Sequence, residues 1–219
     1  MEVNLLRKAV AETTGTAFLA AAVVGSGIMS ERMANGNAAL TLLGNTIATG
    51  AILIVLILVF GAISGAHFNP VVSLSFALQN KLRWREFAVY VLMQIVGGIC
   101  GTILAHTMFG LPQIEISTHA RTGLGIWTGE IVASFGLLVT ILGCLKTRPE
   151  TVPYAVGAFI MGGYWFTSST SFANPAVTIA RSLTDTFSGI SPNDVPAFVA
   201  AQVIGAILAT FFARWLYSA

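Results

Sequence analysis

Residues 67–74 read HFNPVVSL and residues 172–179 read FANPAVTI, and these two stretches match each other position by position. Each stretch places an asparagine directly before a proline, and Asn69 and Asn174 lie 105 residues apart. Asparagine is favoured at the N-cap of a helix, and proline suits the first helical turn because its missing N–H would have no partner there. Each stretch therefore predicts a short helix that starts at its Asn-Pro pair.

The sequence around both stretches is strongly apolar. Hydrophobic residues make up 55% of the 219 residues and charged residues only 9%, whereas a soluble domain carries about 25% charged residues. So few charges cannot cover a surface that faces water, so we expect a lipid bilayer to surround much of the chain. The net charge of +2 and the lack of a basic cluster argue against a nucleic-acid partner.

Windows without charge, together with the window 122–145 in which Glu130 is the one charge, mark the expected membrane spans, because a spanning helix needs about 20 mostly apolar residues. One helix over the longest window, residues 33–80, would extend about 72 Å, against about 30 Å for the hydrocarbon core. The chain must turn back there, and Gly61, Gly65 and Pro70 are the natural breaks. The sequence predicts six spans, at about 13–30, 40–62, 87–114, 122–145, 152–167 and 195–213, and half-helices at about 69–79 and from about 174.

The two halves of the chain repeat each other. QIVGG at 94–98 matches QVIGA at 202–206, and Glu12 and Glu130 each lie early in the first span of a half. Three spans in each half, an odd number, give the halves opposite orientations. Broken helices at matching positions of such an inverted repeat indicate a binding or conduction site. We expect one transmembrane channel domain over 1–219, with repeats at about 1–110 and 120–219.

Lysine and arginine predict the orientation, because they are enriched in cytoplasmic loops. With both termini in the cytosol, eight of the eleven cations lie inside and three outside. The inner group comprises Arg7, Lys8, Lys81, Arg83, Arg85, Lys146, Arg148 and Arg214, and the outer group comprises Arg32, Arg121 and Arg181. We therefore expect a multi-pass protein of the cell membrane, inner or plasma, with cytoplasmic termini.

Residues 64–71, SGAHFNPV, and residues 174–176, NPA, together with the early glutamates, resemble the aquaporin or major intrinsic protein family over essentially the whole chain. The resemblance implies an all-α right-handed bundle of six transmembrane helices plus two re-entrant half-helices, one pore per subunit, and usually a homotetramer. It implies no cofactor, and we expect no metal site. The pore motifs would be Asn69, Pro70 and Val71, where alanine is more common than Val71, and Asn174, Pro175 and Ala176.

The resemblance also assigns supporting and pore-lining residues. Glu12 and Glu130 would hold the loops before the half-helices by accepting backbone N–H groups. His67 would line the pore, although a packed loop histidine is the alternative. Carbonyl groups of Gly65, Ala66, His67, Thr170, Ser171 and Phe172 would replace the hydrogen bonds that a solute loses on leaving water.

Counted from the motif asparagines, the four positions of the family's selectivity filter fall at Thr49, Gly162, Ser171 and Val177. Water-selective members carry Phe, His and Arg at the first, second and fourth positions, and glycerol-conducting members keep Arg and use two aromatics. This chain has neither Arg nor an aromatic there, even if the second position is Gly163. We expect a wide, neutral filter that passes glycerol, urea, metalloid hydroxides such as arsenite, and water; Thr and Val resemble the filters of bacterial members associated with arsenic resistance.

Other functions stay open at this stage. Arg181, one turn after Val177, is interpreted as a snorkelling arginine at the outer surface, and residues 164–166 as an interfacial aromatic belt. Either feature could instead narrow the pore, which would favour a water-selective aquaporin. A secondary transporter, which usually needs a coupling-ion site, and an anion channel, which the missing filter Arg disfavours, are weaker alternatives. No constellation of nucleophile, base or paired carboxylates indicates an enzyme.

Overall fold

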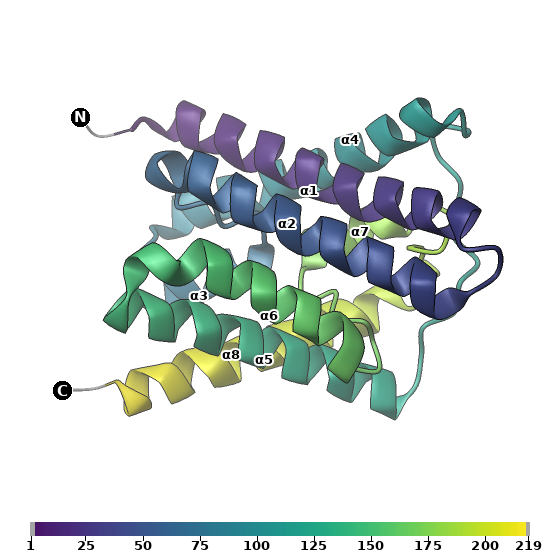
Figure 1. The fold of residues 1–219 in the computed structure, drawn as a ribbon. Helices are drawn as coiled ribbons and strands as arrows, with labels where there is room; N and C mark the ends of the chain where they lie inside the picture. Colours follow the sequence, from purple (N-terminus) through teal and green to yellow (C-terminus); the bar gives the residue numbers. More distant parts are fainter. Residues whose placement is uncertain (1–2, 218–219) are drawn as a thin grey trace.

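The computed structural model describes residues 3–217, and this part of the chain is helical, with loops between the helices. The elements are α1 (Leu5–Met33), α2 (Ala38–Ser64), α3 (Pro70–Leu78), α4 (Trp84–Phe109), α5 (Leu124–Thr147), the 3₁₀ turn η1 (Pro149–Thr151), α6 (Val152–Phe166), α7 (Pro175–Arg181) and α8 (Val195–Leu216). Six long helices and two short ones confirm the predicted fold class. Figure 1 shows the long helices running side by side, with the start of α1 and the end of α8 at the same end of the bundle, here named the termini end.

Five of the long helices have the length and apolar composition to cross a membrane: α1, α2, α4, α5 and α8. Helix α6 has 15 residues, which at 1.5 Å per residue is about 22 Å, less than the hydrocarbon core. The turn η1 leads directly into its start and lengthens this part of the chain. The helix predicted at 152–167 is therefore present, but it is shorter than the other five and is not among the helices long enough to cross a membrane.

The half-helices α3 and α7 come from different halves of the chain and touch each other. In Figure 1, α3 lies toward the termini end and α7 toward the opposite end, here named the far end. Each half-helix begins where the sequence predicted, at Pro70 or at Pro175. Together they fill the interior of the bundle from both sides.

Matching glycines allow the closest helix contacts in the two halves. A Cβ atom on Gly97 of α4 would lie 2.3 Å from the carbonyl oxygen of Thr13 in α1. In the second half, a Cβ atom on Gly205 of α8 would lie 2.4 Å from the carbonyl oxygen of Ile131 in α5. Thr13 and Ile131 directly follow Glu12 and Glu130, so the same close approach sets both glutamates at the same depth of their helix pairs.

Hydrogen bonds join the loop after α4 to the loop after α7 at the far end. The backbone N–H of Thr118 donates to a carboxylate oxygen of Asp185 at 2.8 Å, and that of Arg121 to Asp194 at 2.7 Å. The Thr118 hydrogen bonds hold the pKa of Asp185 below its usual range. The Arg121 side chain also donates to the carbonyl oxygens of Gly189 and Phe187. These contacts tie the loop after α4 to the loop after α7.

We expect Gly97→Ala to lower the stability of the protein, because the added methyl group meets a backbone oxygen that cannot move aside. Overpacking of this kind costs about 1–3 kcal/mol. Thermal unfolding of the protein in a mild detergent measures the effect. Gly162→Ala is the matched control, since a Cβ atom at Gly162 has no neighbour within 4 Å; an equal loss in both variants would contradict the packing explanation.

Candidate functional site: a pore along the bundle axis

Each half-helix is capped by its own asparagine. The Asn69 side chain accepts from the backbone N–H of Val71 at 3.1 Å, and the Asn174 side chain accepts from Ala176 at 3.0 Å and Val177 at 3.3 Å. Each asparagine has extended backbone and is followed by proline in the first turn. The local chemistry therefore starts both helices where the sequence predicted.

The same two asparagines join the halves. The amide of Asn69 donates from Nδ2 to the carbonyl oxygen of Ala173 at 2.7 Å, and that of Asn174 donates to the carbonyl oxygen of Phe68 at 2.8 Å. Each contact links one half-helix to the loop before the other. An amide nitrogen carries two hydrogens, so each asparagine keeps a second N–H for a solute. The N-termini of both half-helices, which carry partial positive charge, meet at this point.

Buried carboxylates hold the two re-entrant loops. Glu12 accepts from the backbone N–H groups of His67 at 3.0 Å and Phe68 at 2.7 Å. Glu130 accepts from Phe172 and Ala173, both at 2.9 Å. Both glutamates are fully buried. The geometry is therefore the one that the family resemblance implied for these residues.

One buried glutamine completes each carboxylate site. Gln94 donates to Glu12 at 2.7 Å and to the Ser73 hydroxyl at 3.0 Å. Gln202 donates to Glu130 at 2.6 Å and to Thr178 at 2.9 Å. In the sequence these glutamines mark the repeat, and their matching positions were the available signal for a shared structural function.

The loops keep their shape through left-handed backbone conformations. In the first loop φ is +86° at Gly65, +50° at Ala66 and +48° at Phe68. In the second loop φ is +62° at Thr170, +52° at Ser171 and +46° at Ala173. Residues with side chains rarely adopt this region. The hydrogen bonds that the glutamates accept therefore stabilise a backbone conformation that the loop residues would rarely adopt alone.

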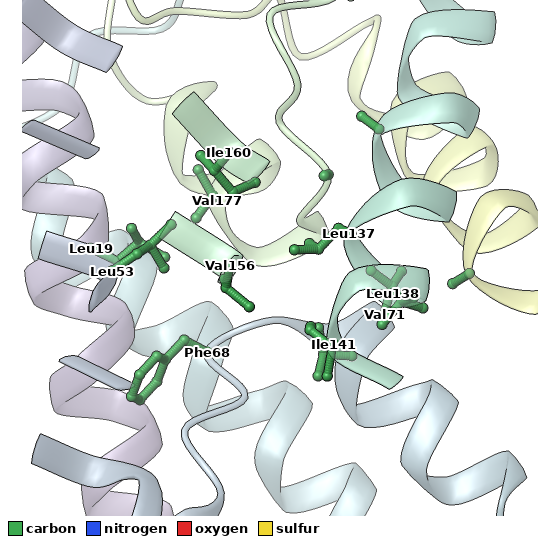
Figure 2. Packing of buried hydrophobic residues seen from close by; sticks show 14 of the residues in the cluster. Leu19, Leu53, Phe68, Val71, Leu137, Leu138, Ile141, Val156, Ile160 and Val177 are labelled. Carbon is green, nitrogen blue, oxygen red and sulfur yellow. The ribbon is translucent and has the colours of Figure 1, made fainter. Parts of the chain in front are cut away.

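A cavity of about 350 Å³ runs through this region. Its wall on α6 includes Pro153, Val156, Ile160 and Tyr164, which span about 16 Å of helix at 1.5 Å per residue. Asn69 and Asn174 also line it. Figure 2 shows the apolar residues that line or surround it converging from separate helices. The buried hydrophobic cluster is therefore largely the wall of a cavity.

Most of the predicted pore residues line this cavity, and some do not. The members are Thr49, Gly65, Ala66, His67, Asn69, Ser171, Phe172, Asn174 and Val177. Pro70, Val71, Pro175 and Ala176 are buried in the first turns of the half-helices instead, and Thr170 and Gly162 are not in the lining. His67 lies against the rings of Phe76 and Tyr90 and contacts the Ser73 hydroxyl at 3.0 Å, so it is packed and pore-lining at once.

Gly162 does not lie where the sequence count placed it. It is exposed, and it follows Ile160 by two residues, which is about 200° around the helix. Tyr164, four residues after Ile160, lies on the cavity side and is only 4% exposed. Its hydroxyl contacts that of Thr49 at 3.2 Å. The α6 wall at this end of the cavity therefore carries an aromatic residue, so the belt interpretation is wrong for Tyr164, while Trp165 and Phe166 are exposed.

Arg181 also differs from the expectation. It is 3% exposed and lines the cavity, so the interpretation as a snorkelling surface arginine is wrong. Its guanidinium carbon lies 3.4 Å from the ring centroid of Phe172, and its Nε donates to the carbonyl oxygen of Ser188. The loop after α7 folds back and supplies this acceptor, which holds the arginine inside.

The far end of the cavity therefore combines hydroxyl groups, one cation and aromatic rings. Thr49 and Tyr164 pair through their hydroxyls. The buried Ser171 hydroxyl has no hydrogen-bond partner within the described part of the chain, so it is available to a solute. Arg181 forms none of the ion pairs found among residues 3–217. A solute with oxygen or nitrogen groups can replace its lost water contacts here.

Comparison with known proteins agrees with this geometry. Residues 1–167 match the model of the family described as major intrinsic protein. The chain is 54% identical to "Aquaglyceroporin AqpS" of Rhizobium meliloti, over 98% of this chain and 92% of that protein. It is 30% identical to "Aquaporin NIP1-1" of Zea mays, over 100% of this chain and 76% of the relative. The solved structure of the aquaglyceroporin from Plasmodium falciparum superposes with a TM-score of 0.77 at 20% identity, covering 98% of both chains.

These similarities and the fold define a membrane channel of the aquaporin type. The chain belongs to the major intrinsic protein family. Its architecture of six long helices and two half-helices is the one that this membership requires.

We expect Glu130→Gln to destabilise the protein, because an amide NH₂ group or a single carbonyl must then face two backbone N–H donors and the Gln202 amide. A buried donor left without a partner costs about 1–3 kcal/mol. Thermal unfolding and gel filtration in detergent measure the loss. The exposed Glu150→Gln is the control. A Glu130→Gln protein that is fully stable and correctly assembled but does not conduct would contradict a structural function.

Proposed function

We propose that this protein is a passive channel for small uncharged solutes, including glycerol, urea, metalloid hydroxides such as arsenite, and water. The cavity along α6 is the observation that carries this proposal. Its lining extends from Pro149 and Val152, at the termini end of α6, to Tyr164 and Arg181 at the far end. Asn69 and Asn174 lie between them, so a solute meets hydrogen-bond donors midway.

The lumen has two chemically different sides, which suits a solute with both carbon and hydroxyl groups. Leu53, Leu137, Val156 and Ile160 supply apolar contacts. The carbonyls of the re-entrant loops and the asparagine amides supply polar ones. A lost hydrogen bond costs several kcal/mol in an apolar medium, so a row of polar groups lowers the barrier to passage.

Cations are disfavoured at two places. The facing N-termini of α3 and α7 each carry about half a positive charge, and Arg181 adds a full charge inside the cavity. Neutral solutes are not repelled by either. The proposed selectivity is therefore for neutral molecules over cations.

The filter that we propose is narrower than the one expected from the sequence, and it carries a positive charge. Three of the expected filter residues line the cavity with small side chains: Thr49, Ser171 and Val177. Two larger residues narrow the same region. They are Tyr164, two residues after Gly162, and Arg181, four residues after Val177. The combination of an arginine and an aromatic residue resembles the filter of glycerol-conducting members. The four residues counted from the motif asparagines include neither an arginine nor an aromatic. The 54% identical relative named as an aquaglyceroporin supports this choice.

We further propose that the channel lies in the cell membrane with both termini in the cytosol and functions as a homotetramer. The excess of lysine and arginine toward the termini end supports the orientation, and family membership supports the assembly. One channel domain with two inverted repeats fits the matching contacts of Glu12 and Glu130.

Light scattering from reconstituted vesicles tests the solute class. After an osmotic step with sucrose, vesicles with the channel should shrink and stay shrunken. With glycerol or urea outside they should shrink and then swell again faster than protein-free vesicles. Fast shrinking without swelling would instead indicate a water-selective aquaporin and contradict the proposed solute class, although the channel itself would stand.

Tyr164→Ala should raise glycerol passage relative to water passage, because the variant removes a ring from the narrowing. Trp165→Ala is the matched control, since Trp165 is the adjacent residue but is 51% exposed. The ratio of glycerol to water permeability in the same vesicle assay is the measurement. An unchanged ratio in Tyr164→Ala, or an equal change in both variants, would show that Tyr164 does not narrow the pore.

A further inference from the structure

A second cavity of about 300 Å³ lies at the termini end, where α3, α5 and α8 finish. Figure 1 shows the ends of α5 and α8 together at this end of the bundle. The lining combines three cations with polar and apolar residues: Lys81, Lys146, Arg214, Gln79, Tyr217, Leu142, Leu145 and Ala213. It is distinct from the pore in charge, since the pore contains a single lysine or arginine in its lining, Arg181.

The three cations are not neutralised by carboxylates in the described part of the chain. The ion pairs among residues 3–217 use Lys8, Arg83 and His119 instead. Three helix C-termini contribute a partial charge of about −0.5 each, which offsets about half of three positive charges. The cavity therefore keeps a clear positive excess, and the side chains of Lys81, Lys146 and Arg214 are exposed and can reach an anion.

The walls of this cavity are fixed by local contacts. Gln79 donates to the carbonyl oxygen of Ser75 at 3.2 Å, and the Lys81 ammonium lies 5.9 Å from the Phe76 ring. The Tyr217 hydroxyl packs against Gly143, where a Cβ atom would lie 2.7 Å away. These contacts place polar groups around a cavity whose floor includes the buried residues Leu142 and Ala213.

We propose that this cavity binds a phosphate group, carried either by the headgroup of an anionic lipid or by free phosphate. Basic pockets between membrane helices on the cytoplasmic side bind anionic headgroups, and the volume is at the lower end of small-molecule sites. The cytoplasmic placement rests on the proposed orientation; the binding does not. Leu145 lines both this cavity and the pore, so the bound group lies beside the mouth of the pore.

Binding to the purified full-length protein in an uncharged detergent tests the proposal. Native mass spectrometry and thermal unfolding report binding of dioleoylphosphatidylglycerol, of inorganic phosphate, and of zwitterionic dioleoylphosphatidylcholine as reference. The variant replaces Lys81, Lys146 and Arg214 by Gln. Each cation near an anionic group contributes about fivefold in affinity, so we expect more than about fiftyfold weaker binding. The control replaces Arg7, Arg85 and Arg148 by Gln, which are exposed and outside the cavity.

Preference for phosphatidylglycerol that is lost only in the cavity variant would support a lipid headgroup as the bound species. Binding of inorganic phosphate with the same dependence, and no preference among lipids, would support free phosphate. No preference for either anion, or an equal loss in both variants, would overturn the proposal. Lys146→Gln alone, a single exposed change, gives the same comparison if the triple variant does not assemble. None of these results depends on whether the pore conducts glycerol.

Discussion

Two buried carboxylates hold the irregular backbone of the re-entrant loops inside the bundle, and the cavity forms around those loops. Glu12 and Glu130 face only donors: backbone N–H groups of the loops, a glutamine amide and, at Glu12, the Ser64 hydroxyl at 2.6 Å. An ionised carboxylate is an acceptor only, so these partners match it. Hydrogen bonds to charged groups contribute about 1.5–3 kcal/mol each. Without such acceptors the loop N–H groups would lie unpaired among apolar helices.

This constraint reaches the pore in a short chain of contacts. The carboxylates fix the loops, the loops direct their carbonyls, and the crossed bonds of Asn69 and Asn174 fix one half-helix against the other. Gly97 and Gly205 let the helices that carry Gln94 and Gln202 come close enough to reach the carboxylates. The central part of the pore is therefore specified twice, once by each half, with nearly the same residues.

At the far end of the pore the two halves contribute different residues. Arg181 is held by a carbonyl from the following loop and by the Phe172 ring, and Tyr164 pairs with Thr49 across the cavity. The first half offers no counterpart of this arginine at its own half-helix, which ends in Phe76, Ala77 and Leu78. The filter that we propose therefore lies where the repeat is broken.

The helices, the breaks between them and the matching of the two halves could be predicted from the residues alone. Apolar windows with at most one charge bound the spans, Asn-Pro pairs start the half-helices, and Glu12 and Glu130 stand at matching positions. These features depend on local chemistry and on the membrane as solvent. Which side chains face the cavity at the far end could be seen only once the helices were placed in space. The sequence distance from Asn174 does not give the rotation of α6, which directs Gly162 away from the cavity and Tyr164 toward it. It also does not show that the loop after α7 folds back and holds Arg181 inside. Those outcomes depend on helix rotation and on contacts between distant segments, which a linear pattern does not encode.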